Sequence, residues 1–293
     1  MIRKIIDILK MTKPTQLLLL SITMYGAYFI GGGGLDPKIL LLLGVTSLGS
    51  AGGVTALNMY IERDIDAVMK RTSNRPLPSG RLSQTEALIG VILLIFAGTI
   101  AGYLINKWVM LTTLIGLYFD IIAYTEVAKR RTEWSLLFGS VAGAMPALGG
   151  WAAATGSIGL PGLLLAGMVY VWQPLHVAFI HYYYAEDYRR AGVPTIPGNL
   201  GHRYFALLAK FSILLLVFLD AVFVVVEGYG VISLLVAACL AYRALKSVKR
   251  FSRHPLPATA RAMIRYASPM LGIIFLLLPI ERVVIIHLHF MIA

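Results

Sequence analysis

Long apolar stretches recur along almost the whole chain, and short polar segments separate them. A run of about 18 or more apolar residues with few charges is typical of a transmembrane helix, because that length crosses the hydrocarbon layer. The pattern predicts an all-α, polytopic fold in which one domain, residues 1–293, packs its helices around a central cavity. Nine spans are expected, at 14–32, 39–61, 86–105, 108–125, 134–153, 160–183, 204–226, 229–245 and 264–280.

The composition supports a membrane protein. Hydrophobic residues make up 58% of the chain and charged residues 14%, which lies outside the range of soluble domains. We expect Glu281 and Arg282 to interrupt the ninth apolar run. The first run follows MIRKIIDILKMTKP without a small-residue cleavage site, so no cleavable signal peptide is expected and a prokaryotic plasma membrane is favoured. The single cysteine, Cys239, excludes a disulfide framework within the chain.

The basic residues predict the orientation in the membrane. Four of them precede the first span, at Arg3, Lys4, Lys10 and Lys13, and the alternate connections carry most of the others. The opposite connections hold only Lys38 and Lys107, with Arg282 near the end. The positive-inside rule therefore places the N-terminus in the cytoplasm. The net charge of +12 is explained by this basic cytoplasmic face against the lipid bilayer, so nucleic acid is not expected as a partner.

An unusual group of carboxylates closes the second span, in the segment NMYIERDIDAVMKRTSNRP (58–76). Asn58, Glu62 and Asp66 follow one another at intervals of four residues, so they share one face of a helix, whereas Asp64 points elsewhere. Carboxylate and amide oxygens are suited to Mg²⁺, which is commonly held by one or two carboxylates together with phosphate oxygens. These three residues are therefore candidate ligands of Mg²⁺ and candidate catalytic residues.

Basic residues follow the carboxylates at once. Lys70, Arg71 and Arg75 can contact an anion, and the helical pattern ends in a turn at Pro76. The C-terminal end of a helix repels anions, so an anion here needs bridging cations and basic side chains, a combination that indicates a diphosphate. The alternative is a solvated loop that is stabilised by local ion pairs.

A second candidate group lies on the predicted sixth helix. Trp172, His176, Tyr183 and Asp187 fall within one face of that helix, with Gln173 at its edge. The face leads from aromatic and imidazole groups inside the membrane to a carboxylate at the cytoplasmic end, as on the second helix. A buried histidine in a membrane helix commonly makes a hydrogen bond between helices. We expect His176 to position an acceptor molecule without ligating it, with ligation of an iron by His176 as the alternative.

Further polar side chains fall in or beside apolar spans. Asp120 lies one turn before Tyr124 and is a candidate to join the site, whereas Asp220 is expected to have a structural partner. Lys129 and Arg130 can contact a diphosphate, although a basic cluster at the interface is also what the positive-inside rule predicts.

Three ordered segments resemble the UbiA superfamily of intramembrane prenyltransferases. They are NMYIERDIDAVMKRTSNRPLPSG, which is similar to the family's first aspartate-rich motif, YTEVAKRRTEWSLLFGSVAGAMPALGGWAAATG (124–156), and WQPLHVAFIHYYYAEDYRRAGVPTIP (172–197). The third segment most resembles the protoheme IX farnesyltransferase branch. Glu62 stands at the family's first aspartate, Val177 and Ala178 replace larger residues, and only Glu186 and Asp187 stand where a second aspartate motif is common.

The resemblance implies a function. It implies Mg²⁺-dependent transfer of a farnesyl group from farnesyl diphosphate to a vinyl group of heme B, with capture of water to give heme O. Asp187 and His176 are expected to position the water or the acceptor, and the protein partner that the resemblance implies is heme A synthase or a terminal oxidase assembly. The alternatives are a related prenyltransferase with an aromatic or glycerophosphate-lipid acceptor, a transporter, and a heme-handling protein without catalysis.

Overall fold

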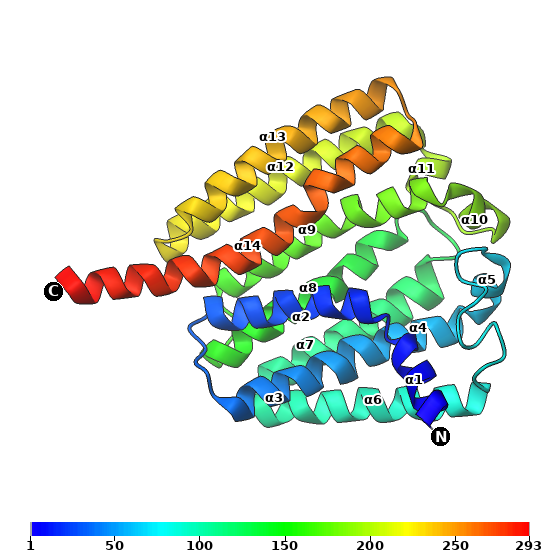
Figure 1. The fold of residues 1–293 in the computed structure, drawn as a ribbon, viewed down its shortest axis with the longest axis horizontal. Helices are drawn as coiled ribbons and strands as arrows, with labels where there is room; N and C mark the ends of the chain where they lie inside the picture. Colours follow the sequence, from blue (N-terminus) through cyan, green and yellow to red (C-terminus); the bar gives the residue numbers. More distant parts are fainter. Residues whose placement is uncertain (1, 293) are drawn as a thin grey trace.

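The described part of the protein, residues 2–292 of a computed structural model, is a bundle of helices (Figure 1). Its elements are α1 (Ile2–Met11), α2 (Pro14–Ile30), α3 (Pro37–Thr46), η1 (Ser47–Gly52), α4 (Gly53–Ile61), α5 (Arg63–Val68), α6 (Gln84–Ile105), α7 (Lys107–Leu117), η2 (Tyr118–Ala128), α8 (Ser135–Thr155), α9 (Leu160–Tyr183), α10 (Ala185–Arg190), α11 (Ile196–Asn199), α12 (Gly201–Glu227), α13 (Val231–Arg253) and α14 (Pro257–Ile292). The helices α3, η1 and α4 form one continuous rod, and α7 continues into η2 in the same way.

The polytopic all-α fold is confirmed. Within residues 2–292, eight helices are long and apolar enough to cross a membrane, and α2 is a shorter apolar helix of 17 residues beside them. Eight full-length spans and one short one correspond to the nine expected. Helix α8 lies at the centre of the first half of the bundle, where it packs against α2, α7, η2 and α9.

Two of the rods change from α-helix to π-helix in the middle of the bundle. The π-helical segments are η1, which packs against α6, and η2, which packs against α8. A π-helical turn widens the backbone ring and is frequent at functional sites. It also shifts the face on which later side chains lie, which a period of 3.6 residues does not anticipate.

Close packing of these rods depends on glycines, which have no Cβ atom. A Cβ atom at Gly98 of α6 would lie 2.3 Å from the backbone nitrogen of Ser50, and one at Gly143 of α8 would lie 1.8 Å from Oε1 of Gln173. Small residues allow membrane helices to approach closely. These contacts hold η1 against α6 and α8 against α9.

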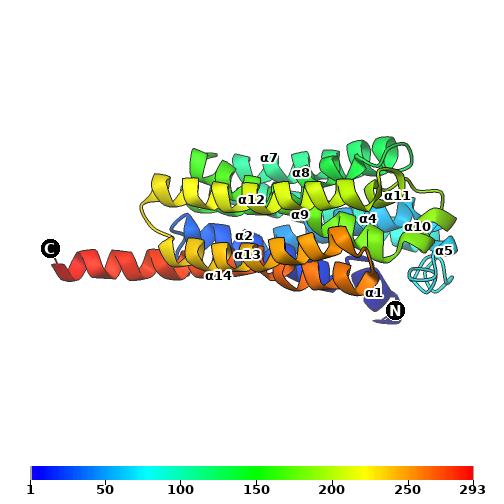
Figure 2. The ribbon, with the colours of Figure 1, turned by 90° about the horizontal axis from the view of Figure 1, so that it is seen from above.

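The two ends of the bundle differ. The short helices α5, α10 and α11 lie together at one end, while α14 extends past its neighbours at the other end (Figures 1 and 2). The expected interruption at Glu281 is wrong, because α14 continues through it. The Glu281 carboxylate instead accepts hydrogen bonds from the backbone nitrogens of Ile232 (2.9 Å) and Ser233 (2.7 Å), so it caps the free N–H groups at the start of α13.

Asp220 of α12 also differs from expectation. Its side chain is fully buried, and neither carboxylate oxygen accepts a hydrogen bond from any residue that the structure describes. Within the described part of the chain, the structural partner that the sequence led us to expect is therefore not found as a hydrogen-bond donor to Asp220. An unpaired acid in a membrane helix is costly as a carboxylate.

Candidate functional site

The carboxylate motif lies at the end of the bundle that carries the short helices. Helix α4 ends at Ile61, Glu62 forms a joint with φ −87° and ψ 12°, and α5 begins at Arg63. Backbone hydrogen bonds from Glu62 to Asn58 (2.9 Å) and from Asp66 to Glu62 (2.8 Å) preserve the four-residue spacing across the joint. Asn58, Glu62 and Asp66 are all buried, with exposed fractions of 5%, 4% and 3%.

Each of the two buried carboxylates faces a cation. Lys129, directly after η2, forms an ion pair with Glu62, and Nη1 of Arg75 lies 2.6 Å from Oδ2 of Asp66. Burial alone would disfavour the Lys129 ammonium, but the Glu62 carboxylate outweighs this effect and raises the pKa of Lys129. Two carboxylates are thus each paired with a cation in a small, largely buried space.

This arrangement fits a magnesium–diphosphate complex. Hard carboxylate oxygens suit Mg²⁺, and the amide oxygen of Asn58 lies one turn away. The amide nitrogen of Asn58 already donates to Oγ1 of Thr125 (2.7 Å), which leaves its oxygen available for another contact. The cations Lys129 and Arg75 can exchange their carboxylates for phosphate oxygens, so every charge keeps a partner.

Asp64 and Arg130 lie outside this space. They form a bidentate ion pair, in which each Nη atom of Arg130 lies 2.8 Å from one carboxylate oxygen of Asp64. Both side chains are largely exposed. The hydrogen bond from Arg130 lowers the pKa of the Asp64 carboxyl. Asp64 therefore points away from the motif, as the helical spacing predicts, and Arg130 contacts it rather than the buried carboxylates.

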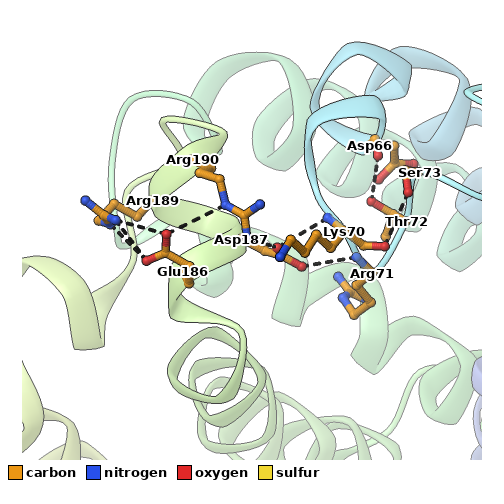
Figure 3. A network of polar contacts seen from close by, with 9 residues as sticks. All are labelled: Asp66, Lys70, Arg71, Thr72, Ser73, Glu186, Asp187, Arg189 and Arg190. Carbon is orange, nitrogen blue, oxygen red and sulfur yellow. Dashed lines mark hydrogen bonds and ion pairs between the residues drawn. The ribbon is translucent and has the colours of Figure 1, made fainter.

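Asp187 joins two elements that are far apart in the sequence. Its carboxylate, on α10, accepts hydrogen bonds from the backbone nitrogens of Lys70 (3.2 Å) and Arg71 (3.1 Å), as well as from Arg190 (3.0 Å) (Figure 3). The side chains of Lys70 and Arg71 are exposed, and the Arg71 guanidinium lies 4.8 Å from the centre of the Tyr184 ring. Asp187 thus fixes the loop that leads from α5 to Arg75.

Lys13 belongs to this charged region, although sequence reasoning placed it only among the basic residues of the N-terminus. It is the only residue other than glycine with positive φ among those described, with φ 49° and ψ 73°. Burial and the nearby Arg75 guanidinium lower the pKa of Lys13 to about 8, while the Glu62 carboxylate acts in the opposite direction. A left-handed conformation is costly for lysine and is frequently retained at functional sites.

A cavity of about 100 Å³ opens beside the motif, between α2, the α3–α4 rod, the α7–η2 rod, α8 and α9. Its walls are mostly apolar or hydroxyl-bearing, and Gln173 is the only one of the expected α9 residues that lines it. Asp120 of η2 is the only titratable side chain on its walls within the described chain. The cavity and the carboxylate motif share η2, because Thr125, which accepts from Asn58, donates to the backbone oxygen of Asp120 (2.7 Å).

The residues that were expected on one face of the sixth helix face different neighbours in the structure. Trp172 and His176 stack on each other with ring centres 4.7 Å apart, and they face α14 rather than the cavity. Nε1 of Trp172 donates to the Ala267 oxygen (2.7 Å), and Nδ1 of His176 lies 3.2 Å from Oγ of Ser268. Tyr183 is exposed at the end of α9. The void beside Trp172 and His176 measures only about 10 Å³.

Comparison with known proteins settles the family. Residues 19–269 match the model of the UbiA prenyltransferase family. The chain belongs to this family. A protoheme IX farnesyltransferase of Aeropyrum pernix is 47% identical over 277 residues, which are 94% of this chain and 92% of that protein. A protoheme IX farnesyltransferase of Korarchaeum cryptofilum is 41% identical over 280 residues, which are 96% of this chain and 95% of that protein.

Solved structures of other proteins show the same fold. A digeranylgeranylglyceryl phosphate synthase superposes with a TM-score of 0.79 over 95% of this chain and 98% of that one, at 18% identity. A UbiA homologue of Archaeoglobus fulgidus bound to geranyl diphosphate and Mg²⁺ gives a TM-score of 0.63 over 93% of this chain and 99% of that one, at 13% identity. The UbiA fold is thus compatible with a bound prenyl diphosphate and Mg²⁺ in that homologue.

Proposed function

We propose that this protein transfers a farnesyl group from farnesyl diphosphate to a vinyl group of heme B, which gives heme O and diphosphate. The observation that carries the proposal is the near full-length similarity to protoheme IX farnesyltransferases of several archaea. The buried carboxylates and cations lie beside a cavity with apolar and hydroxyl-bearing walls, and together they supply what such a reaction requires. Members of this family are prenyltransferases, which disfavours a transporter and a heme-handling protein without catalysis.

The charged region would hold the donor. Glu62 and Asp66, with the amide oxygen of Asn58, would bind Mg²⁺, which supplies charge neutralisation to the diphosphate. Lys129 and Arg75 would turn from the carboxylates to the phosphate oxygens and stabilise the negative charge that develops there as the allylic C–O bond breaks. Lys13 would add a third cation.

The loop that Asp187 fixes would close over the donor. The exposed side chains of Lys70 and Arg71 start from the backbone positions that Asp187 holds, so they can reach a diphosphate at the surface of the site. We therefore assign Asp187 a positioning role in place of direct contact with water. Arg130 would reach the diphosphate only by leaving its exposed ion pair with Asp64, which itself takes no part in donor binding.

The acceptor would approach along α9. Gln173 lines the cavity and would contact the acceptor directly. Trp172, His176 and Tyr183 would contact the rest of the porphyrin, which requires α9 and α14 to separate, because the void beside Trp172 and His176 is far smaller than a heme. We place the whole chain in one domain, with its N-terminus and the charged region on the cytoplasmic side, where a water-soluble diphosphate is released.

Acceptor identity is tested by incubating the purified protein in detergent with farnesyl diphosphate and Mg²⁺. Heme B, a phenolic quinone precursor and a glycerophosphate lipid are offered in separate reactions, and the products are identified by mass spectrometry. We expect a farnesylated and hydrated heme and no prenylated product from the other acceptors. Prenylation of the phenol or of the lipid in place of heme would overturn the assignment of heme B, although a prenyltransferase activity would stand.

A further inference from the structure

The proposed reaction creates a proton that must be removed. The C1–O bond of the donor breaks and diphosphate leaves with the electron pair, after which C1 bonds to the outer carbon of the vinyl group. The positive charge then rests on the inner vinyl carbon. When the oxygen of a water molecule bonds to that carbon, one proton of the water must leave, so a base within the cavity is favourable.

One side chain on the walls of the cavity can act as this base. Asp120 is the only titratable side chain among its described lining residues, and the other polar groups there are hydroxyls and amides. Glu62 and Asp66 are already matched with Lys129 and Arg75, and Asp187 accepts three hydrogen bonds. These three carboxylates therefore have other partners, and Asp120 remains.

The backbone around Asp120 directs it toward the cavity. It lies in the π-helical segment η2, which widens the turn, and the Thr125 hydroxyl donates to the Asp120 backbone oxygen. The same hydroxyl accepts from Asn58, so the position of Asp120 is linked to the carboxylate motif. The charged groups that act on Asp120 are Lys13, Glu62 and Lys129, from the segments before α2, after α4 and after η2.

We propose that Asp120 is the base that accepts the proton from the water added to the alkylated acceptor. This inference rests on the proposed function. Asp120 also lies close to the path of the positive charge, so its carboxylate stabilises the cation until water reaches it. The proton passes from Asp120 to the departing diphosphate or to bulk water, which returns the carboxylate to its starting state.

The test compares Asp120→Asn with Asp220→Asn, which neutralises another buried acid that does not line the cavity. Each variant is given heme B, farnesyl diphosphate and Mg²⁺, and the hydrated product and the dehydrated product, which is lighter by one water, are measured separately. For Asp120→Asn we expect the hydrated product to form about 100-fold more slowly, with a larger share of dehydrated product. For Asp220→Asn we expect the wild-type product ratio.

A binding measurement separates catalysis from folding. Binding of an unreactive farnesyl thiodiphosphate with Mg²⁺, followed by calorimetry, is expected to be unchanged in Asp120→Asn. Hydrated product at the wild-type rate and ratio would overturn the proposal, and so would a loss of analogue binding that matches the loss of rate. If the wild-type protein forms no farnesylated heme, the proposed function fails, and that result is visible before any variant is compared.

Discussion

At the scale of single residues, charge and backbone geometry each explain part of the site. The four-residue spacing of Asn58, Glu62 and Asp66 predicted a common face, and their burial together agrees with it. The left-handed conformation of Lys13 could not be predicted, because no local sequence signal favours positive φ for a lysine before a proline. The residue before it, Thr12, lies so close to Gly52 that a Cβ on that glycine would be 3.2 Å from the Cβ of Thr12, a tertiary contact that the local sequence does not reveal.

Substitution of Lys13 separates strain from charge. Glycine relieves a left-handed conformation that costs about 1–2 kcal/mol for other residues, but it adds about 0.5–1 kcal/mol of chain entropy. We therefore expect Lys13→Gly to be at least as stable as the wild type, and more stable than Lys13→Ala, which keeps the strained conformation. Both variants lose the ammonium, so both should raise the KM for farnesyl diphosphate by roughly tenfold or more.

The control for this pair is Lys10→Ala, which removes an exposed lysine that is 3.4 Å from Asp7. Steady-state kinetics and thermal unfolding in detergent measure both properties. A KM for Lys13→Gly equal to that of Lys10→Ala would exclude a role of Lys13 in donor binding.

At the scale of elements, the sequence predicted the helices better than their faces. The expected span at 160–183 coincides with α9, but helical spacing placed Asp187 on that helix, whereas α9 ends at Tyr183 and Asp187 lies on α10. The same spacing grouped Trp172 with Gln173, although the first faces α14 and the second the cavity. A regular period cannot show which neighbour each face meets or where a π-helical segment changes the register.

The role of Asp187 is tested at this scale. Asp187→Asn removes the charge that holds the backbone nitrogens of Lys70 and Arg71, which should cost about 1–3 kcal/mol of local stability. We expect faster hydrogen exchange in residues 69–75 and a higher KM for the donor, while the overall fold remains. Glu186→Gln is the matched control, since Glu186 is exposed and pairs with Arg189 (2.9 Å). Unchanged exchange in 69–75 for Asp187→Asn would contradict the positioning role.

At the scale of the whole molecule, hydropathy predicted the polytopic bundle. The distance between neighbouring helices depends on close packing at glycines, which hydropathy does not predict. Gly98→Ala would place a Cβ 2.3 Å from the backbone of Ser50 and should separate α6 from the rod that carries the carboxylate motif. We expect a lower temperature of unfolding and lower activity. Gly272→Ala is the control, because a Cβ there meets no atom within 4 Å. Equal unfolding temperatures for the two variants would contradict this packing account.

The central claim is that the buried carboxylates Glu62 and Asp66 hold the metal on which farnesyl transfer depends. The most direct measurement follows farnesylated heme and released diphosphate for the wild type, Asp66→Asn and Asp64→Asn, with Mg²⁺ and again with EDTA. The account predicts product from the wild type and from Asp64→Asn with Mg²⁺ only, and at least about 100-fold less from Asp66→Asn. Product from Asp66→Asn at the wild-type rate, or from the wild type in EDTA, would contradict it.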